Sequence, residues 1–221
     1  MNYFDKTKLD EFYNGLFEKN KLTLLSGGVG DKYLTSPNSD NRMSLALLIR
    51  ANTFVSSEIN DCIKELKSIE PYIYYYPVQD FHLTVIDILR GVSNRQMPDN
   101  LNDYIQCVEE CRQKIKPFCI KFAGLTASDN AVMVKGYYER ELEQFRQLMR
   151  QSLKNSGLAL EERYETFSAH ITIARIPVKL SNPIKFVDYI SSNEKLFGIN
   201  NVTNFELVFH NWYDSKKIIC Y

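Results

Sequence analysis

Two segments of this chain begin with the same short pattern, and that pattern limits how the chain can fold. His82 is followed by leucine, threonine and valine, and His170 is followed by isoleucine, threonine and isoleucine. Each pattern opens an apolar run rich in β-branched residues, 81–89 and 168–176, which is typical of a strand. The chain must therefore accommodate two similar strands that each start with a titratable side chain.

Successive side chains of a strand point to opposite faces of the sheet. His82 and Thr84 therefore share one face, as do His170 and Thr172. The chance that two of the three histidines fall in this pattern is on the order of one in ten thousand, so we favour a functional interpretation over two ordinary strand histidines. If the strands lie side by side, two imidazoles and two hydroxyls meet at one place.

These groups are sufficient to cleave a phosphodiester. One imidazole takes a proton from water while the other donates a proton to the departing sugar oxygen. The hydroxyls of Thr84 and Thr172 donate hydrogen bonds to the phosphoryl oxygens. We expect His170 to be the base and His82 to be the acid, and the pattern alone also allows the reverse order.

Three further residues are candidates for substrate binding. Ser168 shares the face of His170 and either lines the site or orients the imidazole. Tyr76 ends an aromatic run and is a candidate for stacking on a base, although packing is the commoner role of such a residue. Arg175 suits an anionic substrate, but strict alternation from His170 places it on the opposite face unless the strand bends or ends there. His210 has no threonine after it, and we favour packing at a surface turn over a rim contact to a base.

The composition offers neither bulk charge nor a metal site. Basic and acidic residues number 27 each, so an anionic ligand requires local contacts and not a global field. The five cysteines lack the spacing of a zinc site, and only Asp80 and Asp87 add carboxylates near the motifs. We therefore expect no cofactor and no metal.

The remaining segments contain both helix and strand patterns. Helices are predicted over 4–19, 56–69, 101–115, 139–154 and 183–192, and strands over 44–50, 81–89, 118–125, 131–135, 168–176, 202–210 and 217–221. This order predicts an α+β fold, with residues 1–43 as an N-terminal helix and loop extension and 44–221 as one domain.

The chain has no apolar stretch of about 18 residues that could cross a bilayer, and its start does not resemble a signal peptide. We expect a cytoplasmic monomer. The expected partner is a small nucleotide or an RNA terminus that carries a phosphodiester. A membrane or a long nucleic-acid duplex is not expected, because a duplex binder should present a basic face.

The two motifs resemble those of the two-histidine (2H) phosphoesterase superfamily, and the likeness covers about residues 44–221. Segments 115–153 and HITIAR (170–175) further resemble its LigT-like branch, the RNA 2′,3′-cyclic phosphodiesterases also described as 2′-5′ RNA ligases. The resemblance implies a bilobal, pseudo-symmetric fold, in which two antiparallel-sheet lobes with outer helices flank a central cleft that holds a metal-free site. It also implies hydrolysis of 2′,3′-cyclic or 2′-5′ phosphodiester bonds.

Two alternatives to this hypothesis remain at this point: a non-catalytic nucleotide-binding module, and a hydrolase of cyclic oligonucleotide signals. A bell-shaped pH profile between about pH 5 and 8 would separate catalysis from binding, and a panel of substrates would separate the two hydrolases.

Overall fold

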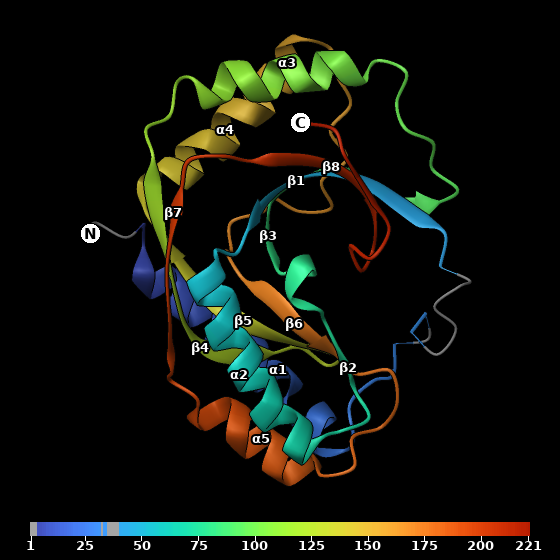
Figure 1. Cartoon of the computed structure of the whole chain (residues 1–221), viewed down its shortest axis with the longest axis vertical. Helices are drawn as coiled ribbons and strands as arrows, with labels where there is room; N and C mark the ends of the chain where they lie inside the picture. Colours follow the sequence, from blue (N-terminus) through green and yellow to red (C-terminus); the bar gives the residue numbers. More distant parts are fainter. Residues whose placement is uncertain (1–3, 32, 35–39) are drawn as a thin grey trace.

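In the computed structural model, which describes residues 4–31, 33–34 and 40–221, nine strands of the described part form one sheet (Figure 1). The strands are β1 (Arg42–Arg50), β2 (Tyr74–Tyr75), β3 (His82–Ser93), β4 (Phe118–Ala127), β5 (Ala131–Tyr138), β6 (Ile171–Arg175), β7 (Leu196–Val202), β8 (Glu206–Asn211) and β9 (Lys217–Ile219). Their order is β7-β4-β5-β6-β3-β1-β8-β9, with β2 beside β6, and every pair is antiparallel.

Helices cover this sheet at both ends, so the predicted α+β class is confirmed. They are α1 (Lys6–Leu25), α2 (Thr53–Ile69), α3 (Leu101–Arg112), α4 (Arg140–Asn155) and α5 (Pro183–Ser192), together with a 3-10 turn over Val78–Asp80. Helices α3 and α4 pack on each other at the top of Figure 1, and α2 and α5 lie at the bottom. Of the helices in the described part, none is long and apolar enough to span a membrane.

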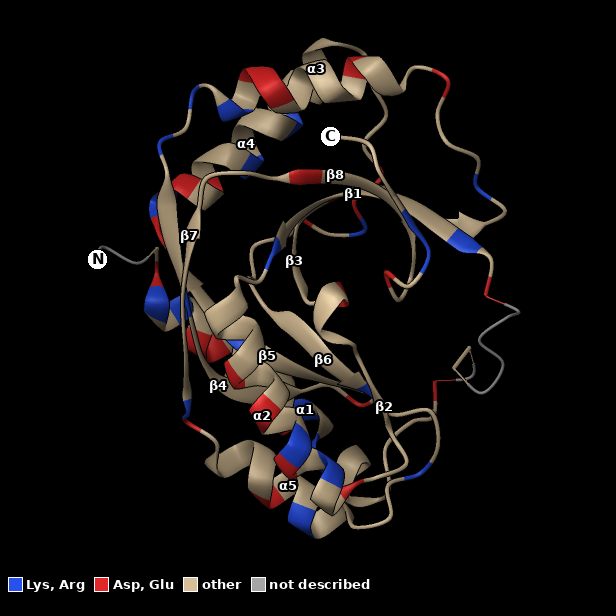
Figure 2. Cartoon of the chain, viewed as in Figure 1, with Lys and Arg blue, Asp and Glu red and all other residues tan. Residues whose placement is uncertain are grey.

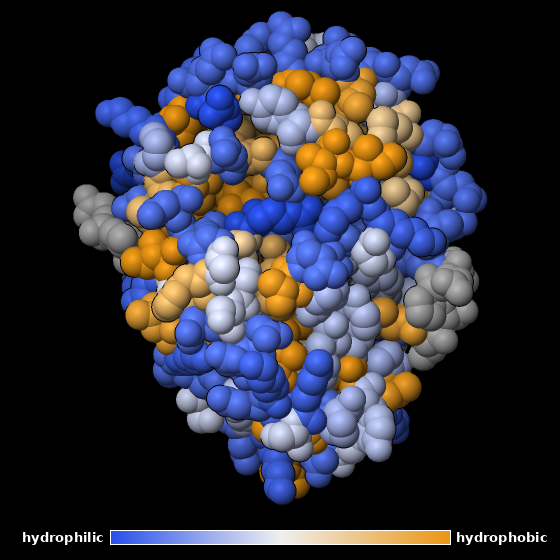
Figure 3. All heavy atoms as spheres, in the orientation of Figure 1, coloured by the Kyte–Doolittle hydropathy of each residue, from blue (hydrophilic) through white to orange (hydrophobic). Residues whose placement is uncertain are grey.

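Neither positive nor negative residues dominate the view of the chain in Figure 2. Basic and acidic residues are interspersed along the helices and loops. Apolar atoms on the face shown in Figure 3 are likewise scattered among hydrophilic ones. An anionic ligand therefore has to be bound by a local set of side chains, as the balanced composition predicts.

The strand predictions fail between residues 196 and 210. The sequence predicts one strand over 202–210, whereas β7 ends at Val202 and β8 begins only at Glu206. Strand β7 was not predicted, because its sequence LFGINNV contains a glycine and two asparagines, which have low strand propensity. Pairing with β4 along its length holds this edge strand in place.

Helix α1 belongs to the same hydrophobic core as the sheet. It packs on β4, β5 and α5. The buried residues of this helix are Leu9, Tyr13, Phe17 and Leu24. The boundary between an extension, 1–43, and a domain, 44–221, stays a prediction, and part of that extension (1–3, 32 and 35–39) lies outside the described residues.

We expect Leu9→Ala to lower the free energy of unfolding by about 2–5 kcal/mol, because it opens a cavity under a fully packed helix. Leu22→Ala on the same helix is the matched control, since Leu22 is 80% exposed, and its expected cost is below about 0.5 kcal/mol. Urea unfolding measures both variants. Equal and small effects would show that α1 is not part of the cooperative core.

Candidate active site

The two motif strands, β3 and β6, are neighbours joined by a single residue pair. Leu83 lies opposite Ile171, and both side chains are fully buried. Continuing this antiparallel register places His82 opposite Thr172 and places His170 opposite Thr84. The pleat turns these four side chains to the face away from Leu83 and Ile171. In a regular antiparallel ladder, residues related as the two imidazoles are would be diagonal neighbours about 7–8 Å apart.

One cavity of about 430 Å³ receives all four motif side chains. This volume lies within the range of small-ligand sites. The other three candidates from the sequence line the same cavity: Tyr76, Ser168 and Arg175. Helix α1 contributes Phe12 and Leu16 to its wall, so the N-terminal extension forms part of the site.

His82 begins β3 and keeps 16% of its side chain exposed. Its Nδ1 lies 2.8 Å from the carbonyl oxygen of Asp80. A carbonyl can only accept, so Nδ1 carries the proton of the neutral ring and Nε2 is left without one. Burial lowers the pKa of His82 to about 4, reinforced by His210 and opposed by the Asp214 carboxylate. At neutral pH, His82 of the free protein is therefore uncharged.

His170 immediately precedes β6, and its Nδ1 lies 3.2 Å from the hydroxyl oxygen of Ser168. Burial lowers the pKa of His170 to about 4, and the guanidinium groups of Arg175 and Arg146 reinforce the shift. Within the described residues no carboxylate lies within 4.0 Å of His170, whereas Oδ2 of Asp214 is 3.7 Å from Nδ1 of His82. The two imidazoles therefore differ in their electrostatic surroundings.

Arg175 faces the cavity, so the placement expected from strict alternation is wrong. Thr172 and Ala174 pair with consecutive residues of β5, which leaves Ile173 as the extra residue of a β-bulge. A bulge shifts the alternation of the residues that follow it, and accordingly Ile173 and Ala174 are both buried. Arg175 Nε donates to the hydroxyl of Tyr76 over 3.3 Å.

His210 does not pack at a surface turn as predicted. It lies on β8, is buried, lines the cavity, and has its ring centroid 5.9 Å from that of His82. Its Nδ1 is 2.9 Å from Oδ1 of Asp214, an ion-pair distance, although the two groups are not aligned for a hydrogen bond. One carboxylate thus lies between two imidazoles.

Asp214 was not identified from the sequence. It occupies the turn between β8 and β9 with a left-handed φ of 57°, and its side chain is fully buried. The carboxylate also binds Arg50 and Lys217, the latter at 2.9 Å. Burial raises the pKa of Asp214, but His210, Arg50, His82 and Lys217 together hold it well below its usual range. The carboxylate is therefore ionised beside His82.

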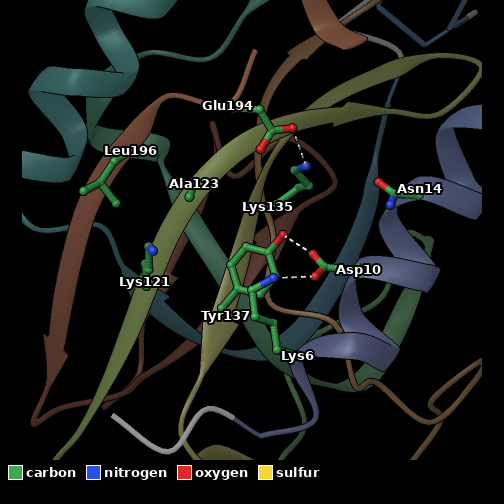
Figure 4. A pocket seen from close by; sticks show the side chains of 9 residues that line it. All are labelled: Lys6, Asp10, Asn14, Lys121, Ala123, Lys135, Tyr137, Glu194 and Leu196. Carbon is green, nitrogen blue, oxygen red and sulfur yellow. Dashed lines mark hydrogen bonds and ion pairs between the residues drawn. The ribbon is translucent and has the colours of Figure 1, made fainter. Parts of the chain in front are cut away.

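A second cavity, of about 410 Å³, lies on the other side of α1 and contains no histidine. Four of its charged groups form two ion pairs, Lys6 with Asp10 at 2.5 Å and Lys135 with Glu194 at 3.6 Å, and Lys121 also lines it (Figure 4). The candidate acid–base residues therefore line the first cavity. Across the described residues, no group of three or more His, Cys, Asp or Glu side chains is arranged to hold a metal ion, and all five cysteines are free.

The fold of this chain is similar to that of known structures over 80% of its length. TT0787 of Thermus thermophilus shares this fold with a TM-score of 0.54 at 18% identity, over 80% of this chain and 97% of that one. E. coli LigT, in a complex with 3′-AMP, has a TM-score of 0.50 at 15% identity, over 80% of this chain and 93% of that one. No protein-family model and no curated protein sequence matches the chain. The likeness confirms the α+β class and a LigT-like fold, and the bilobal, pseudo-symmetric arrangement stays a prediction.

Proposed function

We propose that the protein is a metal-independent phosphodiesterase that hydrolyses 2′,3′-cyclic or 2′-5′ phosphodiester bonds of RNA ends or small nucleotides. The observation that carries this proposal is the meeting of His82, Thr84, His170 and Thr172 in one cavity. The diagonal spacing leaves room for a phosphate between the imidazoles, and the hydroxyls are placed to bind its non-bridging oxygens. The complex of LigT with 3′-AMP supports a nucleotide as the ligand.

The surrounding charges favour His170 as the base and His82 as the acid. A bound phosphodiester raises the pKa of both imidazoles, and the one beside the Asp214 carboxylate gains a proton more readily. His170 then takes a proton from water as the water oxygen forms its bond to phosphorus. His82 gives its proton to the sugar oxygen as the old P–O bond breaks.

The three remaining candidates support this reaction in different ways. Arg175 has no carboxylate within 4.0 Å in the described part of the chain, and we assign it to an anionic oxygen of the substrate. Tyr76 is only 4% exposed, which favours support of Arg175 over stacking on a base. Ser168 orients His170 through its hydroxyl. The half-sheets on either side of the seam, β7-β4-β5-β6 and β3-β1-β8-β9, correspond in this proposal to the two lobes.

A substrate panel tests the proposal. The purified protein is incubated in EDTA with nucleoside 2′,3′-cyclic monophosphates, 2′-5′ and 3′-5′ dinucleotides, and cyclic dinucleotides, beside His82→Ala and His170→Ala. We expect turnover of cyclic monophosphates or 2′-5′ dinucleotides that each substitution lowers by about 10²–10⁴-fold. Turnover of cyclic dinucleotides alone would favour the signal hydrolase. Binding of 3′-AMP without turnover of any substrate would favour the non-catalytic module.

The pH profile is expected to lie below the range of ordinary imidazoles. The pH dependence of kcat/KM reports groups of the free enzyme, and burial lowers the pKa of both His82 and His170 to about 4. The protonated acid becomes scarce as the pH rises past this value, so kcat/KM should fall by about tenfold per pH unit above pH 5. A maximum of kcat/KM near pH 7 would contradict two uncharged histidines in the free protein.

A further inference from the structure

Arg146 of helix α4 is fully buried, and its guanidinium reaches both motif strands. On the His82 side, Nε donates to the carbonyl of Val85 over 2.8 Å and Nη2 to that of Thr84 over 3.4 Å. On the His170 side, Nη1 donates to the carbonyl of Phe167 over 2.9 Å and Nη2 to that of Ser168 over 2.7 Å. All four acceptors are main-chain oxygens within three residues of a motif histidine.

The seam explains why a guanidinium occupies this place. The ladder between β3 and β6 includes only Leu83 and Ile171, and no further pair of described residues joins these two strands on the side where Arg146 enters. Buried carbonyls beyond the last pair need other donors, because a buried acceptor without a partner destabilises the fold. A guanidinium carries five N–H donors in a rigid fork. One side chain can therefore donate to both segments and fix the distance between them.

Tyr13 of helix α1 completes this arrangement on the His170 side. Its fully buried hydroxyl accepts the amide N–H of Ala169 over 3.0 Å and donates to the carbonyl of Gly136 over 3.1 Å. The hydrogen bond between Asp10 and Tyr137, 2.6 Å long, fixes the same helix to β5 (Figure 4). The residue before His170 is thus held from α1, and the two residues before that are held from α4.

We propose that Arg146 is a positioning residue that sets the spacing of His82 and His170 across the seam. This inference rests on the proposed function, because it gives a role to the acid–base pair. Arg146 is not among the described residues that line the cavity, and it acts through the main chain from which the two imidazoles project. Tyr13 contributes to the His170 side alone.

Arg146→Lys is expected to lower kcat by about 10–100-fold with little change in KM, since a displacement of about 1 Å at reacting groups costs on the order of 100-fold. Lysine keeps the charge, but it donates from one nitrogen and cannot reproduce the set of hydrogen bonds to both segments. In a His170→Ala background the same substitution should cost no further activity, because no pair remains to be positioned. A full loss in that background would overturn the proposal.

Arg150 provides a matched control one turn further along α4. It makes a comparable set of hydrogen bonds, but to the loop that precedes β6: Nε and Nη2 to Glu162 at 2.7 and 3.0 Å, Nη1 to Glu165 at 3.2 Å, and Nη2 to the carbonyl of Thr166 at 3.2 Å. Arg150→Lys is therefore expected to lower the melting temperature without changing kcat.

Imidazole NMR resonances give a readout that does not depend on turnover. We expect Arg146→Lys to shift the resonances of both His82 and His170, Tyr13→Phe to shift those of His170 alone, and Arg150→Lys to shift neither. Unmoved resonances in Arg146→Lys would overturn the proposal. Arg146→Gln, which keeps a planar group with two N–H donors, serves as the second variant if the lysine variant does not fold. Shifted resonances in Arg146→Lys, together with a wild type that turns over no substrate, would refute the proposed function and leave the positioning role intact.

Discussion

Replacing either His82 or His170 by alanine should lower kcat by about 10²–10⁴-fold, and replacing both should cost little more than replacing one. The two proton transfers belong to one displacement at phosphorus, so neither imidazole accelerates the reaction without the other. Single-turnover rates on the substrate identified by the panel measure the effect, with circular dichroism as the check of folding. Losses that multiply in the double variant would show that the histidines act independently.

Asp214→Asn should lower the free energy of unfolding by about 3–5 kcal/mol, because it removes the buried anion that Arg50 and Lys217 share. It should also lower kcat at neutral pH. Asp214 raises the pKa of His82, so its loss lowers that pKa further and leaves less of the acid protonated. Urea unfolding and the pH–rate profile measure the two effects, and the profile should move to lower pH.

Glu206→Gln is the matched control for Asp214→Asn. Glu206 binds the same guanidinium, with Arg50 Nε donating over 2.7 Å, but its side chain is 32% exposed. An exposed pair contributes about 0–1 kcal/mol, and Glu206 lies outside the surroundings that shift His82. If both substitutions destabilise the protein equally and leave the pH–rate profile unmoved, Asp214 does not act on the pKa of the proposed acid, His82.

The core of the candidate site could be predicted because strand alternation is a local property. A period of two fixes His82 with Thr84 and His170 with Thr172, whatever the rest of the chain does. The adjacency of the two strands followed from the family resemblance, since no local rule specifies which strands pair. The helices were predicted for a similar reason, because an apolar stripe recurs within a few turns.

The features that escaped prediction depend on long-range pairing. Arg175 was a candidate from the sequence, but its place in the cavity follows from a bulge that only the partner strand β5 defines. His210 and Asp214 approach His82 because β8 pairs with β1, which in turn pairs with β3. Arg146 is different, since it lies within the buried stripe of α4 beside Phe145. An arginine at a core position of a helix was a signal available in the sequence.

The seam between β3 and β6 also bears on how a ligand would act on the protein. In the proposed mechanism the acid lies on β3 and the base lies at the start of β6. A single residue pair, Leu83 with Ile171, joins these two strands. A phosphate bound by Thr84 of β3 and Thr172 of β6 would add a second link between the two strands. This link would lie on the face of the sheet opposite to the Leu83 and Ile171 side chains. Part of the binding free energy of this phosphate would then hold β3 and β6 together. The substrate would thus stabilise the arrangement of acid and base that its own cleavage requires.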